Sequence, residues 1–301
     1  MKILIYLFYL FCFTQPSYQQ IAATIKTPEK ITIEPETIEQ GGLMTIQIPK
    51  DSNLTKVEII CGHDTLVLIE QNNNWVALWA PDLEAETGRY KFKIILEKTD
   101  CHKQTLYRTI FVKKIKAPIK KITLSPRFIK IDSIILERIK REKARLSRAL
   151  SWAYQSKTEI AWTRSFILPL DSAVVSSQFG EKRIFTGKIL SVHNGVDLSA
   201  PGGDSVRAVN DGKIVLIGDF FFEGKLVIID HGGKLFTVYC HLSKILVAEN
   251  QMVKRGQIIG LVGSTGRSTG PHLHWGARLG QARINPLELL RLPILKRGAD
   301  N

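Results

Sequence analysis

Short alternating runs of apolar and polar residues constrain the fold of this chain more than any other feature of its sequence. Between residues 24 and 116, segments such as 44–48 and 90–94 alternate in this way, and turn residues such as Gly41-Gly42 separate them. Successive side chains of a strand point to opposite faces, so this pattern predicts half-buried strands. Strands of this length and spacing favour a β-sandwich.

The pattern changes period over residues 132–155. Four apolar side chains recur there at near-helical spacing among Lys, Arg and Glu: Ile135, Ile139, Leu146 and Leu150. This spacing predicts an amphipathic helix, for which Asp132 or Ser133 is the candidate N-cap. Binding to a membrane surface is one interpretation of such a basic helix. A connector that packs its apolar stripe on a domain is the commoner case and the one we expect.

From Phe166 onward the chain returns to strands and glycine turns, with no long helical pattern. We therefore expect a mainly β protein of two domains, as its length of 301 residues allows. The predicted parts are a β-sandwich module over 24–116, a helical connector over 130–157, and a second β-rich domain over 160–292.

The chain is strongly basic, with 42 Lys and Arg against 28 Asp and Glu and a formal net charge of +14. Such a surface favours polyanions, which include nucleic acids, anionic lipids and acidic cell-wall polymers. The basic residues are dispersed, and no nucleic-acid-binding motif accompanies them. We therefore expect no nucleic-acid partner.

The N-terminal residues indicate export. Lys2 precedes the apolar run 3–13, and the polar residues 14–17 follow it. A membrane-spanning helix needs about 20 apolar residues, so this run is short for a span and is typical of a secretory signal. We predict a signal peptide over 1–20 and a location in the periplasm or cell envelope, with retention as an uncleaved anchor as the alternative.

Three cysteines follow the signal: Cys61, Cys101 and Cys240. An odd number in an exported protein suggests one disulfide and one free thiol. Cys61 and Cys101 lie in the same β-rich region, and we expect them to pair. Cys240 is interpreted as a small buried hydrophobic residue, with metal ligation as the alternative.

Five potential metal or acid–base residues lie in three glycine-bounded segments of the second half. His193 and Asp197 lie in "HNGVDLSAPGG", His241 in "YCHLSKI", and His272 with His274 in "TGPHLHW". The two histidines of the last segment share one face of a strand. Zn²⁺ at a hydrolytic site takes three protein ligands and keeps one position open for water. Two further histidines could orient that water and transfer protons.

Several stretches together resemble the M23 (lysostaphin/LytM-type) zinc metallopeptidases, which cut peptidoglycan peptides. They are "FGEKR", "HNGVDLSAPGG", "VRAVNDGKIV", "VIIDHGGKLFTVYCHLS", "VKRGQIIGLVGSTGRSTGPHLHW" and "INPLELL", within roughly residues 166–290. The resemblance implies that the 160–292 region is an antiparallel β-sheet peptidase domain with a groove. It also implies that His193, Asp197 and His274 bind one zinc ion per chain and that His241 and His272 are the catalytic pair.

Other residues of this region have lesser roles. Arg267, Ser268 and Thr269, in the glycine-rich loop before the last motif, are candidates for substrate contact, with a tight turn formed by the loop's glycines as the alternative. His231 matches a turn of the family and is interpreted as structural. Gly276 stands where many relatives have an acidic residue, so a supporting role there is missing from this chain.

These features predict a zinc-dependent endopeptidase that hydrolyses amide bonds in peptidoglycan stem peptides or cross-bridges during cell-wall remodelling. Peptidoglycan is the expected substrate, and envelope regulators are further candidate partners. The N-terminal module resembles immunoglobulin-like modules and would position the enzyme or cover its groove. The alternative is a non-catalytic wall-binding regulator or activator on the same fold; such proteins typically lose metal ligands, whereas this chain has the full set.

Overall fold

The computed structural model describes residues 31–71, 73–123, 128, 131–155, 159–172, 174–185 and 188–292. Strands make up 49% of the structure and helices 11%, so the chain is mainly β, as the sequence predicts. The signal peptide predicted over residues 1–20 lies outside the described ranges. Within them, no helix combines the length and the apolar character that a membrane crossing needs.

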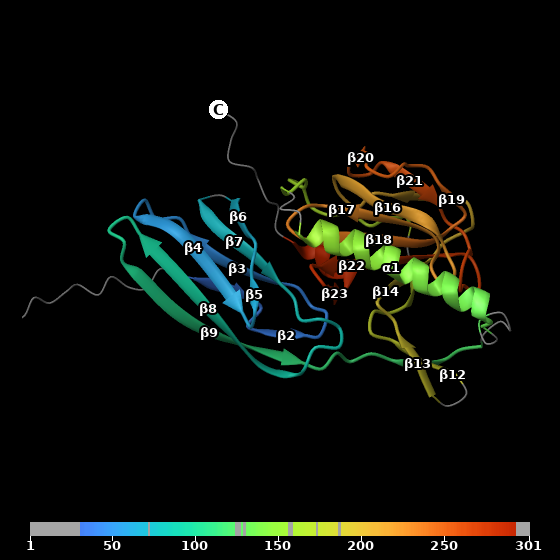
Figure 1. The fold of residues 1–301 in the computed structure, drawn as a ribbon, viewed down its shortest axis with the longest axis horizontal. Helices are drawn as coiled ribbons and strands as arrows, with labels where there is room; N and C mark the ends of the chain where they lie inside the picture. The colour runs from blue at the N-terminus through green and yellow to red at the C-terminus, as the bar shows by residue number, and fades with distance from the viewer. Residues whose placement is uncertain are drawn as a thin grey trace, which may run out of the picture.

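The N-terminal part contains two sheets that share one apolar core (Figure 1). The first sheet has the order β1 (Thr32–Glu34), β3 (Met44–Pro49), β7 (Asn74–Trp79) and β6 (Leu68–Gln71). The second has the order β2 (Thr37–Glu39), β9 (Lys103–Lys113), β8 (Gly88–Lys98), β4 (Leu54–Cys61) and β5 (Asp64–Thr65). Strand β3 alternates buried and partly buried residues, because its buried face contributes Ile46 and Ile48 to the shared core.

The C-terminal part is built on an eight-stranded sheet. Its order is β11 (Val174–Ser177), β14 (Gly195–Ser199), β22 (His272–Leu279), β18 (Leu235–Leu242), β17 (Gly224–Asp230), β16 (Gly212–Phe220) and β20 (Met252–Val253), with β23 (Ala282–Ile284) paired to β22. A smaller sheet has the order β15 (Ser205–Arg207), β21 (Ile258–Leu261) and β19 (Lys244–Ile245). The short 3-10 helix η2 (Pro286–Arg291) follows β23.

The two faces of the large sheet bury different clusters. On β17, Val227 and Ile229 belong to one cluster, while Leu226 and Ile228 belong to another. This division follows from the two-residue period of a strand. The first cluster includes residues of the smaller sheet, such as Val206 and Ile259, and the second packs against the helix α1.

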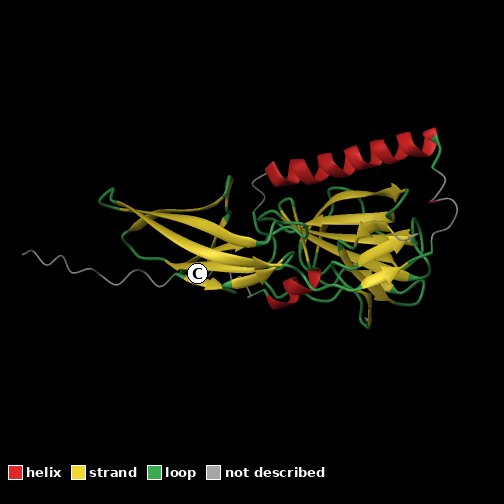
Figure 2. Ribbon diagram, turned by 90° about the horizontal axis from the view of Figure 1, so that it is seen from below, coloured by secondary structure: helices red, strands yellow, loops and turns green. Residues whose placement is uncertain are grey.

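Helix α1 (Ser133–Gln155) occupies the range where the sequence predicts an amphipathic helix and lies along the large sheet (Figure 2). Asp132 is its N-cap, because Oδ1 accepts from the backbone N–H of Ile135 at 2.8 Å. Leu146 and Leu150 pack against the sheet cluster. Arg145 donates to the backbone carbonyl of Ile217 at 2.9 Å. The apolar stripe of the helix thus packs against the protein's own sheet.

A further three-stranded sheet contains a strand from the segment that follows the sandwich. Strand β10 (Ile119–Lys121), from the segment before the helix, pairs in parallel with β12 (Lys182–Phe185), which forms a hairpin with β13 (Lys188–Val192). The sandwich also contacts the C-terminal sheet directly. Arg283 donates to both carboxylate oxygens of Asp82 and to Glu84. Strand β10 and this ion pair therefore connect the sandwich to the C-terminal half.

The expected disulfide between Cys61 and Cys101 is wrong for this structure, in which both thiols are free. Cys61 lies opposite Phe92 in the pairing of β4 with β8, whereas Cys101 follows the far end of β8, beyond Lys98. Six residues of strand separate Phe92 from Lys98, about 20 Å at the usual rise. Bridged cysteines have Cα atoms less than about 7 Å apart. The two residues therefore lie at opposite ends of one sheet.

Candidate metal centre

The register of two adjacent strands brings the candidate ligands together. Strands β14 and β22 are antiparallel, and Asp197 is paired with His274 while Ser199 is paired with His272. Residues opposed in this way have Cβ atoms about 4.5–5.5 Å apart. His193 reaches the same point from the short segment between β13 and β14. One side chain from each of three positions therefore meets on one face of the large sheet.

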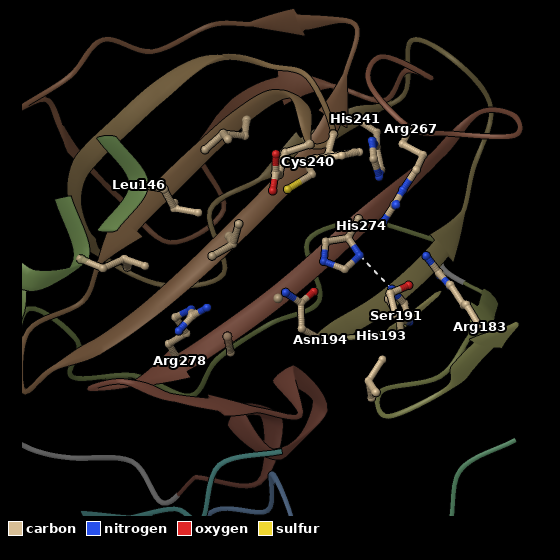
Figure 3. Close-up of a pocket in the computed structure, with 18 residues that line it drawn as sticks. Leu146, Arg183, Ser191, His193, Asn194, Cys240, His241, Arg267, His274 and Arg278 are labelled. Atoms are coloured by element: carbon tan, nitrogen blue, oxygen red, sulfur yellow. Dashed lines mark hydrogen bonds between the residues drawn. The ribbon is translucent and has the colours of Figure 1, made fainter. Parts of the chain in front are cut away.

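Their donor atoms form a nearly equilateral triangle. Nε2 of His193 lies 2.9 Å from Oδ1 of Asp197 and 2.9 Å from Nδ1 of His274. Nδ1 of His274 lies 2.9 Å from the same carboxylate oxygen. Figure 3 marks the contact between the two histidines. Among the described residues, no other group of His, Cys, Asp and Glu side chains converges in this way.

The chemistry of these donors fits a cation. Nδ1 of His193 lies 2.9 Å from the carbonyl oxygen of Gln178, which can only accept, so the neutral ring carries its proton there and presents a lone pair on Nε2. That lone pair faces a buried carboxylate oxygen, which is also an acceptor. Burial alone would raise the pKa of Asp197, but the neighbouring imidazoles of His193 and His274 hold it well below its usual range, so that the group is a carboxylate. Burial lowers the pKa of His274, which favours the neutral, ligating form.

The size of the triangle also suits zinc. Donor atoms of a tetrahedral site with bonds of about 2.0–2.1 Å are roughly 3.3 Å apart. Outward shifts of a few tenths of an ångström would match the three donors to this ion. The nitrogen and oxygen donors are those that Zn²⁺ takes in hydrolytic sites. The residues present therefore fit one zinc ion.

Arg183 holds the second oxygen of the carboxylate. Its Nη2 donates to Oδ2 of Asp197 at 2.5 Å, which leaves Oδ1 as the atom that faces the two histidines. Arg183 comes from β12, and its Nε also contacts Glu181 at 3.4 Å. Sequence reasoning missed this residue, although it lies in the "FGEKR" stretch that supports the family resemblance. No periodicity relates residue 183 to residue 197, so only the hairpin geometry reveals the contact.

The two remaining histidines, His241 and His272, lie beside this triangle, and each ring is oriented by a backbone carbonyl group. Nδ1 of His241 lies 2.8 Å from the carbonyl oxygen of Thr265, and Nδ1 of His272 lies 2.8 Å from that of Gly270. In each neutral ring Nδ1 is thus the donor, and Nε2 is unprotonated. The two ring centroids are 4.8 Å apart. Nε2 of His272 lies 3.8 Å from Oδ1 of Asp197.

His241 reaches the groove through an unusual backbone conformation. Its φ is 64°, in the left-handed region, at the end of β18. Cys240 is paired with His274 and packs toward α1, so strict alternation would direct His241 to the opposite, apolar face. The left-handed residue turns the ring back toward the site. Burial, followed by the charges of His274 and His272, lowers the pKa of His241 to about 3, so the ring is neutral at pH 7.

The candidate substrate residues border the same groove. Arg183 and Arg267 line it together with His193, His241 and His274 (Figure 3). Arg267, Ser268 and Thr269 also line an adjoining depression with Asp197 and His272. Ser268 Oγ donates to the carbonyl oxygen of Gly270 at 2.7 Å. The three loop residues thus adjoin the histidine cluster, and residues 120–123 line the same depression.

Other residues singled out from the sequence lie away from the triangle. His231 is fully buried, between the carbonyl oxygen of Asp211 at 2.7 Å and Thr237 Oγ1 at 2.8 Å. Cys240 belongs to the apolar cluster under α1 and is outside the group of metal-ligating side chains. At Gly276, an added Cβ would lie 3.8 Å from Nε2 of His274. A side chain there could contact the outer nitrogen of that ring, and glycine leaves the position open.

Comparisons with known proteins agree with this geometry. Residues 191–286 match peptidase family M23. The crystal structure of a putative M23 peptidase from Pseudomonas aeruginosa superimposes with a TM-score of 0.61 and 28% identity, over 83% of this chain and 94% of that one.

Two curated relatives are similar over less than half of the chain. The peptidoglycan DD-endopeptidase ShyB of Vibrio cholerae is 40% identical over 44% of this chain and 32% of its own length. The DD-carboxypeptidase/endopeptidase Mpg of Neisseria meningitidis is 42% identical over 41% of this chain and 28% of its own length. The chain thus spans about a third of the length of these relatives. The region that matches peptidase family M23, residues 191–286, contains all three residues of the His-Asp-His triangle.

Proposed function

We propose that this protein is a zinc-dependent endopeptidase that hydrolyses amide bonds in peptidoglycan stem peptides or cross-bridges, and so remodels the cell wall. The convergence of His193, Asp197 and His274 into one donor triangle, with His241 and His272 beside it, carries this proposal. Relatives named as peptidoglycan DD-endopeptidases support the substrate.

The three triangle residues would hold the metal, and two of them have partners that orient them. Gln178 orients His193, and Arg183 orients Asp197. Such outer partners fix the ring or carboxylate in the ligating geometry. When bound, zinc acts as a Lewis acid toward a carbonyl group and lowers the pKa of water.

His241 and His272 would manage protons and developing charge. Because their Nδ1 atoms are held by backbone carbonyls, each neutral ring offers Nε2 as a base toward the groove. After taking a proton, the same atom becomes a donor that can stabilise a developing oxyanion or protonate the leaving nitrogen. The low pKa of His241 assigns it to the neutral form before reaction, as a base requires.

The neighbouring elements would arrange the substrate. We infer that Arg267, Ser268 and Thr269 contact the peptide, because they border the groove beside the histidines. We assign the peptidase domain to residues 160–292 and propose that the module over 24–116 positions it on the wall. A peptidoglycan hydrolase acts outside the cytoplasm, so the proposed location is the periplasm or cell envelope, in keeping with the secretory signal predicted over residues 1–20.

The test is digestion of purified wall material by the full-length, zinc-loaded chain, followed by mass spectrometry of the released muropeptides. We expect new termini at one type of peptide bond, loss of activity on chelation, and recovery on addition of zinc. The control is His274→Ala, which should release nothing. A folded, zinc-containing protein that leaves the wall material intact would instead support the non-catalytic regulator.

A further inference from the structure

Arg267 is a cation in the groove without an acidic partner among the described residues. Its backbone N–H donates to the carbonyl oxygen of Phe222 at 2.8 Å, and its guanidinium carbon lies 4.8 Å from the centre of the Phe222 ring. Within the described ranges, its guanidinium takes part in no hydrogen bond or ion pair. Five N–H donors are therefore held in place by ring stacking and left for another molecule.

Two other arginines differ from Arg267, because each has an acidic partner. Arg183 is paired with Asp197, and Arg283 is paired with Asp82. Arg278, at the other end of the groove, donates to the carbonyl oxygen of Gln281 at 3.2 Å. An unpaired charge that is partly removed from water is costly, so proteins normally provide it with a partner. The partner that Arg267 lacks among the described residues would therefore come from the substrate.

The acidic side chain of Glu223 does not fulfil this role. Glu223 lines the same groove and acts electrostatically on Arg267, but the two side chains make no ion pair within 4.0 Å. Burial raises the pKa of Glu223. Burial, and then the charge of Arg183, lowers the pKa of Arg267. The fold thus places the guanidinium of Arg267 where burial and the charge of Arg183 both disfavour its charged form.

The position of Arg267 points to the group that it would bind. In Figure 3 its side chain extends into the space beside His274, toward Arg183. A guanidinium presents a planar fork that matches the two oxygens of a carboxylate. With Arg183 engaged by Asp197, the free fork beside the triangle is that of Arg267. An anion bound there would lie in the groove that His193, His241 and His274 also line.

We propose that Arg267 binds a free carboxylate on the carbon that bears the leaving nitrogen, so that the site selects peptides with this group. The inference rests on the proposed peptidase function. In a bond between two D-amino acids, the leaving nitrogen belongs to a residue whose α-carbon also carries a carboxyl group. A free carboxylate at this position is the group that Arg267 recognises.

The experiment compares two synthetic stem peptides that end in two D-residues and differ only in the final group, a free carboxylate or a carboxamide. For the full-length, zinc-loaded protein we expect kcat/KM to be at least about tenfold higher for the carboxylate, because a charge-assisted bidentate pair is worth a few kcal/mol. Arg267→Gln should reduce this ratio to about one without changing the zinc content. Arg267→Lys should keep part of it, since charge remains but the fork is lost.

The matched control is Arg291→Gln, which removes a positive charge from an 80% exposed side chain and should keep the full ratio. Calorimetric binding of both peptides to the His241→Ala variant gives a readout that does not depend on turnover. If no peptide is cut, the proposed function fails, yet a tenfold difference in Kd that Arg267→Gln abolishes still supports the inference. Equal affinity for the two peptides, or a preference that survives Arg267→Gln, overturns it.

Discussion

Substituting His241 and His274 separately should distinguish catalysis from metal binding. His241→Ala removes a ring that lies outside the donor triangle, with its centroid 6.0 Å from that of His274. We expect this variant to keep its zinc, because all three donor atoms and their partners stay in place. A positioned acid–base group contributes about 10²–10⁴-fold in rate. The loss corresponds to roughly 3–5 kcal/mol of activation free energy.

His274→Ala should behave differently. It removes Nδ1, which lies 2.9 Å from each of the other two donors, and leaves a nitrogen and an oxygen. Two donors are too few for a hydrolytic zinc site, which takes three protein ligands. Zinc and activity should therefore disappear together. The assay is metal analysis by mass spectrometry after gel filtration, combined with the rate of muropeptide release and a thermal unfolding curve to verify folding.

The control for both variants is His102→Ala, because the side chain of His102 is 84% exposed and far from the groove in sequence and fold. His231 is unsuitable, since its fully buried ring has two hydrogen-bonding contacts whose loss would destabilise the protein. Loss of zinc from His241→Ala, with zinc retained by His274→Ala, would refute the ligand assignment.

Three further predictions concern stability and the thiols. Burial lowers the pKa of His231 to about 4, so the unfolded state binds more protons than the folded state between about pH 6.5 and 4. The free energy of unfolding should therefore fall by roughly 3 kcal/mol as the pH drops through this window. Denaturant unfolding of His231→Gln should show a weaker dependence of this free energy on pH. Arg283→Met removes the hydrogen bonds to Asp82, and we expect a loss of about 1–3 kcal/mol and separate unfolding of the two halves, visible in calorimetry; a single unshifted transition would contradict this. A thiol reagent should modify the exposed Cys101 rapidly in the folded protein and the buried Cys61 only after unfolding. A non-reducing peptide map in which the two cysteines are linked would contradict this prediction.

Much of the local structure could be predicted from residue patterns. The period of two places His272 and His274 on one face of β22, and the apolar spacing of residues 132–155 predicts α1. These features depend on residues that are close together in the chain, so the pattern of apolar and polar residues predicts them. The disulfide prediction was wrong because proximity in sequence and a shared sheet do not determine position along the strands. The register of β4 with β8 places Cys61 and Cys101 at opposite ends.

The amino-acid sequence by itself determined the β class of the chain, the amphipathic helix, and which histidines and aspartate could serve a metal. Their assembly depended on tertiary structure. The pairing of Asp197 with His274 is a matter of strand register, and the contact of Arg183 with Asp197 depends on how a hairpin folds beside the sheet. The left-handed φ that turns His241 into the groove has no local signature. Such arrangements arise from packing between segments distant in the chain, which residue spacing does not encode.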